Sequence, residues 1–116
     1  MRHAILQTVV SIGTLIVFFL SSAAIYNNDE GEEREPTRHI VKIIHMKFVP
    51  DKLVVKKGDT VVWENKDFFP HDVTDENNNW GSSPFGKDEE WSKVITKDEK
   101  YFCNLHKVMK GTIQIE

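Results

Sequence analysis

The pattern of hydrophobic and polar positions from Arg38 to the last residue has the short runs and two-residue alternation of β-strands. Turn signals such as Lys57-Gly58-Asp59 separate these runs, and no stretch before residue 76 keeps a helical period. The sequence therefore predicts an all-β fold, a β-sandwich of about seven to eight short strands. The runs that we assign to strands are residues 40–44, 53–55, 60–64, 91–96, 101–103 and 112–116.

Two segments between these runs have the composition of turns and loops. Residues 48–51 contain Pro50 and are expected to form a turn. Residues 75–86 contain three consecutive Asn and two Gly, which predicts a surface loop. We expect Trp80 and Phe85 to pin this loop to the sandwich, and the large apolar side chain of Trp63 to fill the core.

The chain begins with a long apolar run that the strand pattern does not include. Arg2 provides a positive start, residues 4–20 are mainly apolar, and residues 21–24 are small. We predict that residues 1–25 are a secretory signal peptide or, because the run is long enough to cross a bilayer, an uncleaved membrane anchor. In either case we expect an exported, periplasmic protein, soluble or tethered to the outer face of the inner membrane.

Charge divides the rest of the chain into two parts. Residues 26–37 form an acidic linker, since residues 29–35 carry five acidic side chains and one basic side chain. Such charge runs are typical of solvated spacers. The predicted domain, residues 38–116, has 13 Lys and Arg and 13 Asp and Glu, so its net charge is zero. The absence of a basic stripe argues against a nucleic-acid partner.

Side chains that bind soft metals are concentrated near the end of the chain. Cys103, His106 and Met109 follow one another at intervals of three, and His71 adds a donor from a distant segment. With 5 His and 3 Met in 116 residues, this spacing after the single Cys arises by chance about once in a thousand. Two imidazoles, one thiolate and a weakly bound Met are the donor set of a blue-copper electron-transfer site.

Other metal centres fit this donor set less well. Structural zinc sites draw four ligands from Cys and His, and zinc has no use for a thioether. A thiolate-bridged pair of copper ions needs two Cys, whereas Cys103 is alone. We expect His39 and His45 to be surface residues. The sequence therefore predicts one mononuclear copper per chain.

Three segments together resemble the cupredoxin family. They are residues 55–63 (VKKGDTVVW), residues 70–73 (PHDV) and residues 103–112. The chain is similar to plastocyanins and above all to amicyanins, whose ligand loop has the same Cys-x2-His-x2-Met spacing. The resemblance covers about residues 38–116, and it implies a Greek-key β-sandwich with one type 1 copper. The ligands that it implies are His71, Cys103, His106 and Met109.

Two positions depart from the family pattern. The family loop often has Pro next to its C-terminal His ligand, whereas Leu105 and Lys107 flank His106 here, which favours a more mobile loop. The residue after the first His ligand is commonly Asn in the family, whereas here Asp72 follows His71. We expect the Asn104 amide to donate a hydrogen bond to the Asp72 carboxylate, which would join the two ligand loops.

The resemblance implies that electrons pass through the edge of His106, inside an apolar patch where transient redox partner proteins dock. Candidates for the patch are Phe68, Phe69, Pro70, Leu105 and Val108, with the alternative that Phe68 or Phe69 belongs to the core. We expect a monomeric carrier of single electrons between periplasmic or membrane-bound redox partners. The alternative is a periplasmic protein that binds and delivers copper with the same ligands. We expect no enzymatic activity, because Met109 takes the axial position and no general acid or base converges on the site.

Overall fold

The structure is a computed structural model that describes residues 33–116. The predicted signal or anchor segment and residues 26–32 of the predicted linker lie outside the described residues. The described part contains eight strands and no helix. The strands are β1 (Arg38–Ile44), β2 (Lys47–Val49), β3 (Lys52–Val55), β4 (Thr60–Asn65), β5 (Thr74–Asp75), β6 (Glu90–Val94), β7 (Glu99–Phe102) and β8 (Lys110–Ile115).

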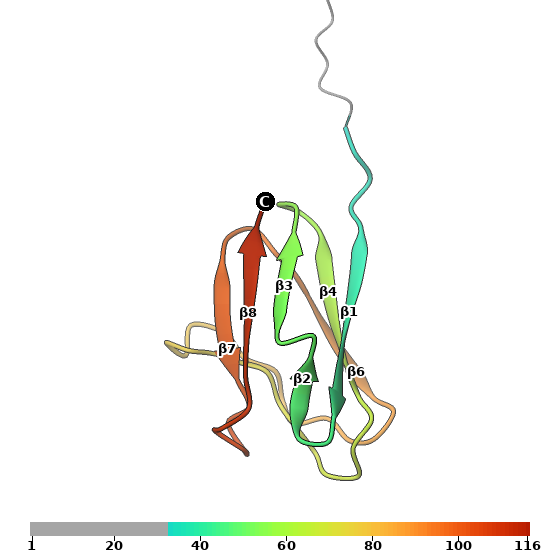
Figure 1. Ribbon diagram of the computed structural model, residues 1–116, viewed down its shortest axis with the longest axis vertical. Coiled ribbons are helices and arrows are strands. Elements are labelled where there is room, and N and C mark those ends of the chain that lie inside the picture. The colour runs from blue at the N-terminus through green and yellow to red at the C-terminus, as the bar shows by residue number, and fades with distance from the viewer. Residues whose placement is uncertain (1–32) are drawn as a thin grey trace, which may run out of the picture. The chain divides into compact units, whose positions relative to one another are not determined.

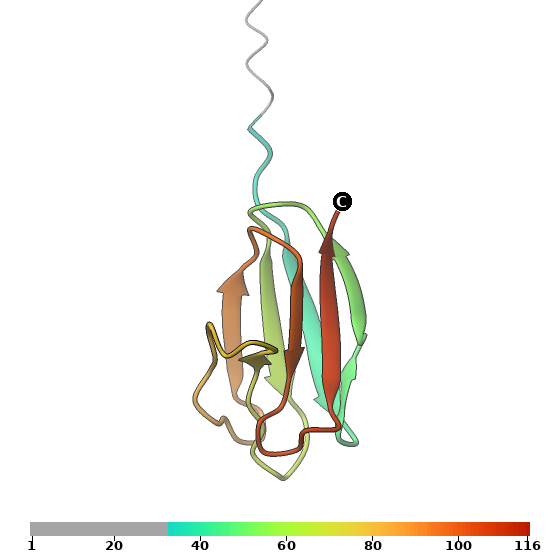
Figure 2. The ribbon, with the colours of Figure 1, turned by 90° about the vertical axis from the view of Figure 1, so that its left-hand side faces the viewer.

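The strands form two four-stranded sheets that pack face to face (Figures 1 and 2). One sheet has the order β2-β1-β4-β6 and the other the order β3-β8-β7-β5. The pairs β1–β4 and β3–β8 are parallel, whereas the other pairs are antiparallel. The predicted all-β Greek-key sandwich of seven to eight strands is confirmed.

Alternating side chains of β1 and β4 build the core between the sheets. Val41 and Ile43 of β1 and Val61 and Trp63 of β4 are completely buried. The ring of Trp63 lies 5.3 Å from that of Tyr101 on the opposite sheet, edge to face. Burial of each such aliphatic side chain contributes about 1.5–3 kcal/mol before the entropy cost of folding is counted. The predicted core role of Trp63 is confirmed.

The connection between β1 and β2 differs from the prediction. The turn is made by His45 and Met46, which both have positive φ (50° and 62°), and Phe48 lies in β2 with its side chain buried. The predicted turn at 48–51 is therefore wrong in its first two residues, and the chain bends at Pro50 and Asp51. Two-residue hairpin turns of this hand usually contain Asn or Gly, so no local pattern indicated a turn at His45.

The segment between β5 and β6 lies against the sandwich, as expected. Phe85 is buried, and the Trp80 ring stacks on that of Trp91 with centroids 6.0 Å apart. The Trp80 indole N–H also donates to the Glu99 carboxylate at 3.1 Å. The prediction that Trp80 and Phe85 pin this loop is confirmed.

A buried carboxylate holds the start of β1 against the turn before β4. Asp59 accepts hydrogen bonds from His39 Nε2 at 2.8 Å, from the Arg34 guanidinium and from the Thr37 N–H. The hydrogen bond from His39 does most to hold the pKa of Asp59 well below its usual value, and the bond from Arg34 adds to it, although burial opposes both. His39 is half-buried in this cluster rather than on the surface, whereas His45 is exposed.

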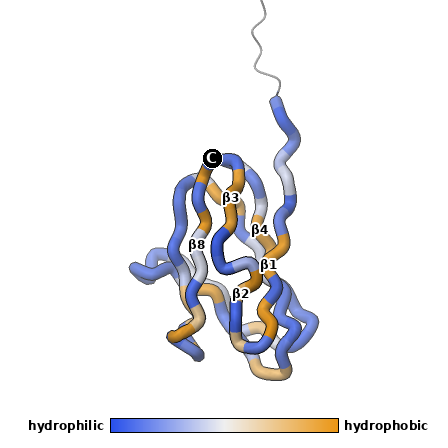
Figure 3. The backbone as a smooth tube through the Cα atoms, viewed as in Figure 1, coloured by the Kyte–Doolittle hydropathy of each residue, from blue (hydrophilic) through white to orange (hydrophobic). Residues whose placement is uncertain are grey.

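The loops that carry the predicted ligands gather at the end of the sandwich away from the C-terminus (Figures 1 and 2). Figure 3 shows hydrophobic residues along β1, β3 and β4 and again in the loops at this end.

No helix among residues 33–116 has the length and apolar character needed to cross a membrane.

Candidate metal centre

The structure brings three of the four predicted ligands together in space. Cys103 Sγ lies 3.8 Å from His71 Nδ1 and 3.8 Å from His106 Nδ1, and the two Nδ1 atoms are 3.2 Å apart. His71 and Cys103 are completely buried, whereas His106 is half-buried. Two imidazole nitrogens and one sulfur therefore form a compact triangle of donors.

The size of this triangle suits a single transition-metal ion. The centre of a triangle with these three sides lies about 2.1 Å from each corner, within the range of about 2.0–2.3 Å for metal–nitrogen and metal–sulfur bonds to zinc. A donor set of two imidazoles and one thiolate, with Met109 as the predicted thioether, suits copper better than zinc. The residues present therefore fit one type 1 copper.

Met109 is buried at the end of the loop that carries Cys103 and His106. Three main-chain hydrogen bonds close this loop. The His106 N–H donates to the Cys103 carbonyl at 3.2 Å, the Met109 N–H to the His106 carbonyl at 2.9 Å, and the Cys103 N–H to the Met109 carbonyl at 3.1 Å. The sequence spacing of three thus corresponds to successive tight turns, each linking one predicted ligand to the next.

The main chain of His71 is fixed by the segment that Phe85 anchors. The N–H groups and carbonyls of His71 and Phe85 exchange hydrogen bonds of 3.2 and 2.9 Å across an isolated antiparallel bridge. The buried Asn65 side chain donates to the carbonyls of Phe69 and Phe85 at 2.8 and 3.0 Å. Two segments far apart in sequence therefore hold the loop that delivers His71.

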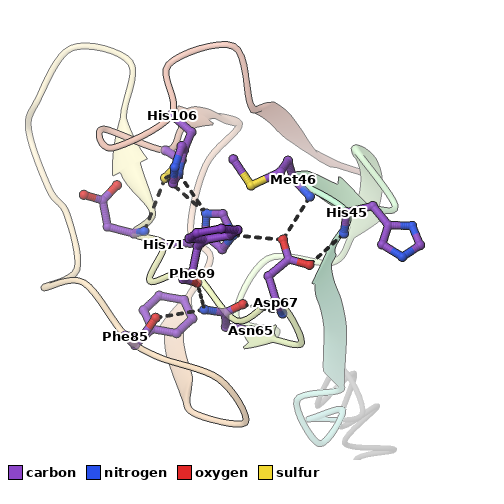
Figure 4. A network of polar contacts seen from close by, with 10 residues as sticks. His45, Met46, Asn65, Asp67, Phe69, His71, Phe85 and His106 are labelled. Carbon is purple, nitrogen blue, oxygen red and sulfur yellow. Dashed lines mark hydrogen bonds and ion pairs between the residues drawn. The ribbon is translucent and has the colours of Figure 1, made fainter.

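Asp67 is a residue of the site that the sequence did not reveal. Its Oδ2 lies 2.9 Å from His71 Nε2, and its carboxylate also accepts the N–H groups of His45 and Met46 (Figure 4). Burial raises the pKa of Asp67, but the hydrogen bonds from Met46, His45 and His71 outweigh burial and hold the pKa below its usual value. A carboxylate four positions before His71 in a loop gives no sequence signal of this contact, which forms only in the folded chain.

Asp72 joins the two ligand loops. Its main-chain N–H donates to Cys103 Sγ at 3.4 Å, and its Oδ1 accepts the main-chain N–H of Asn104 at 2.6 Å. The Thr74 hydroxyl donates to the same oxygen at 3.2 Å. The expected link between Asn104 and Asp72 is present, and its donor is the main-chain amide.

The five residues of the predicted apolar patch are all exposed. Phe68 is 84% exposed, Phe69 63% and Val108 90%, while Leu105 and Pro70 are also exposed. The alternative that Phe68 or Phe69 belongs to the core is therefore wrong. The ammonium of Lys87 lies 4.0 Å from the centre of the Phe68 ring, a cation–π contact that covers part of one face.

The two-sheet fold and this donor set together define a small mononuclear copper protein. The family model of copper binding proteins of the plastocyanin/azurin family matches residues 37–116. The chain belongs to this family, and the predicted resemblance to cupredoxins is confirmed.

Relatives and solved structures agree with this assignment. The chain is 31% identical to an amicyanin of Paracoccus versutus over 89 residues and 31% identical to an amicyanin of Paracoccus denitrificans over 84 residues. Each match covers 66% of this chain and 64% of the relative, so the chain spans a little under two thirds of the length of these amicyanins.

Two solved structures of different copper proteins resemble this fold. A mutant of amicyanin in its Cu(I) form is 28% identical with a TM-score of 0.65, and the match covers 72% of this chain and 87% of that chain. The copper-containing nitrite reductase from Thermus scotoductus is 26% identical with a TM-score of 0.64, and the match covers 72% of this chain but only 23% of that chain.

Proposed function

We propose that this protein is a type 1 copper electron carrier whose ligands are His71, Cys103, His106 and Met109. The observation that carries the proposal is the triangle of two Nδ1 atoms and one Sγ, with sides of 3.2, 3.8 and 3.8 Å. Copper held by such a set supplies one-electron redox chemistry by alternating between Cu(I) and Cu(II).

The contribution of the chain is to hold the donors still. His71 and Cys103 are completely buried, and their main chains are hydrogen-bonded to Phe85 and Met109. The Asp72 N–H donates to Cys103 Sγ, which stabilises negative charge on the sulfur. Because side chains in a close-packed interior have little freedom, the donor positions are expected to change little between the two redox states. Small rearrangement is what a fast electron carrier requires.

The exposed edge of His106 is the proposed route for electrons. This ring is half-buried, whereas the His71 ring, 4.9 Å away, has no exposed surface. The patch formed by Phe68, Phe69, Pro70, Leu105 and Val108 is proposed to dock transient redox partner proteins around it. The exposed Lys107 and Lys110 beside the patch favour a partner with an acidic surface.

We propose a carrier rather than an enzyme. Three donors of the triangle and the buried Met109 would occupy the four positions of the donor set, which leaves no coordination position for a substrate. The likeness to a copper-containing nitrite reductase covers 23% of that chain, so it extends to the sandwich fold and not to the rest of that enzyme.

The cellular setting follows from the sequence. We propose that residues 1–25 direct export as a signal peptide or anchor, that residues 26–37 are an acidic linker, and that residues 38–116 are the copper domain. The protein would then act as a monomer in the periplasm, soluble or tethered to the inner membrane. No nucleic-acid partner is proposed, because the domain has equal numbers of acidic and basic side chains.

The test is the visible absorption and electron paramagnetic resonance spectrum of the purified protein with one equivalent of Cu(II). We expect an intense blue band and a narrow copper hyperfine splitting, both of which a Cys103→Ser variant should lose. A reversible potential with slow metal exchange would support electron transfer. A pale product that passes Cu(I) readily to a competing chelator would instead support copper delivery and contradict the proposal.

A further inference from the structure

We infer that Asp67 is a positioning residue that selects the metal-binding tautomer of His71 and ties this ligand to the β1–β2 turn. This inference rests on the proposed function of the site, because it assigns His71 Nδ1 as a donor to copper. It concerns the copper-free protein as well, since all the contacts that support it lie within the chain.

The first step of the argument is the hydrogen bond between Asp67 and His71. Asp67 Oδ2 lies 2.9 Å from His71 Nε2, and their side chains are 11% and 0% exposed. An ionised carboxylate only accepts hydrogen bonds, so the ring proton of neutral His71 must be on Nε2. The lone pair is then on Nδ1, the atom that faces Cys103 Sγ and His106 Nδ1 (Figure 4).

The second step is the position of the carboxylate itself. Its Oδ1 accepts the His45 N–H at 2.8 Å, and its Oδ2 accepts the Met46 N–H at 2.9 Å. The Asp67 N–H donates to Asn65 Oδ1 at 2.8 Å. Because the side chain and the main chain of Asp67 are both held, the carboxylate can fix the orientation of the His71 ring.

The third step concerns the turn. His45 and Met46 both have positive φ, a conformation that is uncommon for residues other than glycine and that needs support from its surroundings. The Asp67 carboxylate supplies this support by accepting both N–H groups. The Asp67 side chain therefore stabilises a strained hairpin turn and also orients His71. The turn and the proposed ligand are held by the same carboxylate.

A carboxylate behind a ligating imidazole also makes the ring a stronger donor. Loss of such a partner typically lowers metal affinity by about 10–100-fold. We therefore expect Asp67→Asn to weaken Cu(II) binding by a factor in this range. Asn keeps the size of the side chain but replaces one acceptor oxygen by an NH₂ donor, which conflicts with the N–H groups around it.

The decisive measurement is nitrogen-15 NMR of the imidazole rings in the copper-free protein. In the unchanged protein we expect His71 as the Nε2–H tautomer, with a slowly exchanging Nε2 proton. Asp67→Asn should lose this proton signal or shift the ring toward the Nδ1–H tautomer. The matched control is Asp88→Asn, which removes a carboxylate from an exposed loop residue whose positive φ Asn also tolerates.

A second pair of variants separates the effect of Asp67 on the β1–β2 turn from its effect on His71. The double change His45→Asn and Met46→Gly creates an Asn-Gly turn, which adopts this conformation without support. Asp67→Asn placed in that background should still change the His71 tautomer and the Cu(II) affinity, even if the single variant fails to fold.

Two outcomes would overturn the inference. The first is a His71 tautomer that is the same in Asp67→Asn, Asp88→Asn and the unchanged protein. The second is a loss of Cu(II) affinity that the Asn-Gly turn fully restores, since Asp67 would then act on the turn alone. Failure of the proposed function is distinguishable, because it would appear as a missing blue band in the unchanged protein while the tautomer result in the copper-free protein stands.

Discussion

The main-chain N–H of Asp72 donates to Cys103 Sγ at 3.4 Å, so one residue of the first ligand loop contacts the thiol of the second. The carboxylate of the same residue accepts the Asn104 N–H at 2.6 Å. The two proposed ligands His71 and Cys103 are 32 positions apart in the sequence, and this double contact holds their loops together. A negative charge therefore lies beside the proposed copper ligand, which has consequences for the redox potential.

Asp72→Asn should raise the redox potential of the copper-loaded protein. The carboxylate favours the more positive Cu(II) state, and the amide removes this preference while it keeps an acceptor for the Asn104 N–H. Cyclic voltammetry measures the change. Glu76→Gln, which removes a charge from an exposed position, is the control and should have a much smaller effect. An unchanged potential in Asp72→Asn would contradict the role assigned to this carboxylate.

Gly111→Ala should destabilise the fold strongly, because a Cβ atom at this position would lie 2.3 Å from Cζ of Tyr101. Overpacking of this kind typically costs about 1–3 kcal/mol and occasionally more. Urea denaturation of the copper-free protein measures the free energy of unfolding. Gly81→Ala is the matched control, since its Cβ would lie 3.5 Å from the nearest atom, an ordinary contact. Equal stability of the two variants would show that the Tyr101 ring can move aside.

Tyr101→Phe should make the copper-free protein more resistant to alkali. Burial raises the pKa of Tyr101 to about 12, so above pH 10 the unfolded chain releases the phenolic proton before the folded one does. The free energy of unfolding should therefore fall by about 2 kcal/mol between pH 10 and pH 12 on account of this group. The Trp63 indole N–H acts on the hydroxyl without forming a well-aligned hydrogen bond, so removal of the hydroxyl should cost little at pH 7.

The measurement is chemical denaturation of both proteins at several alkaline pH values. Lys side chains titrate in the same range, but they do so in both proteins and cancel in the comparison. Parallel curves from pH 8 to pH 12 would show that the pKa of Tyr101 is not raised.

Val108→Asp should slow electron self-exchange between two copies of the copper-loaded protein by at least about tenfold. Val108 is 90% exposed in the proposed docking patch, where two copies would place like charges opposite each other. Line broadening in NMR spectra of mixed oxidised and reduced protein measures the rate. Val54→Asp is the control, because Val54 is 56% exposed on β3, outside the patch. A similar loss in both variants would indicate a general effect of charge and not docking at the patch.

The sequence by itself determined the fold class and the chemistry of the site. Strand alternation and turn residues are local signals, so β1, β4 and β8 were placed to within a few residues. The spacing of Cys103, His106 and Met109 is also local, since one loop of tight turns delivers all three residues. His71 lies in a different loop. It was predicted because a second imidazole completes the donor set and because residues 70–73 match the family pattern.

Only the tertiary structure decided which distant groups support these ligands. The roles of Asp67 and Asn65 depend on contacts with the β1–β2 turn and with Phe85, none of which leaves a pattern along the chain. The turn at His45 was missed for the same reason, because hydrogen bonds to Asp67 stabilise a backbone conformation that the local residues do not favour. The exposure of both Phe68 and Phe69 likewise reflects how the loops meet at one end of the sandwich. Local propensity thus specifies the strands and the ligand loop, whereas the orientation of the ligands follows from contacts between loops that only folding brings together.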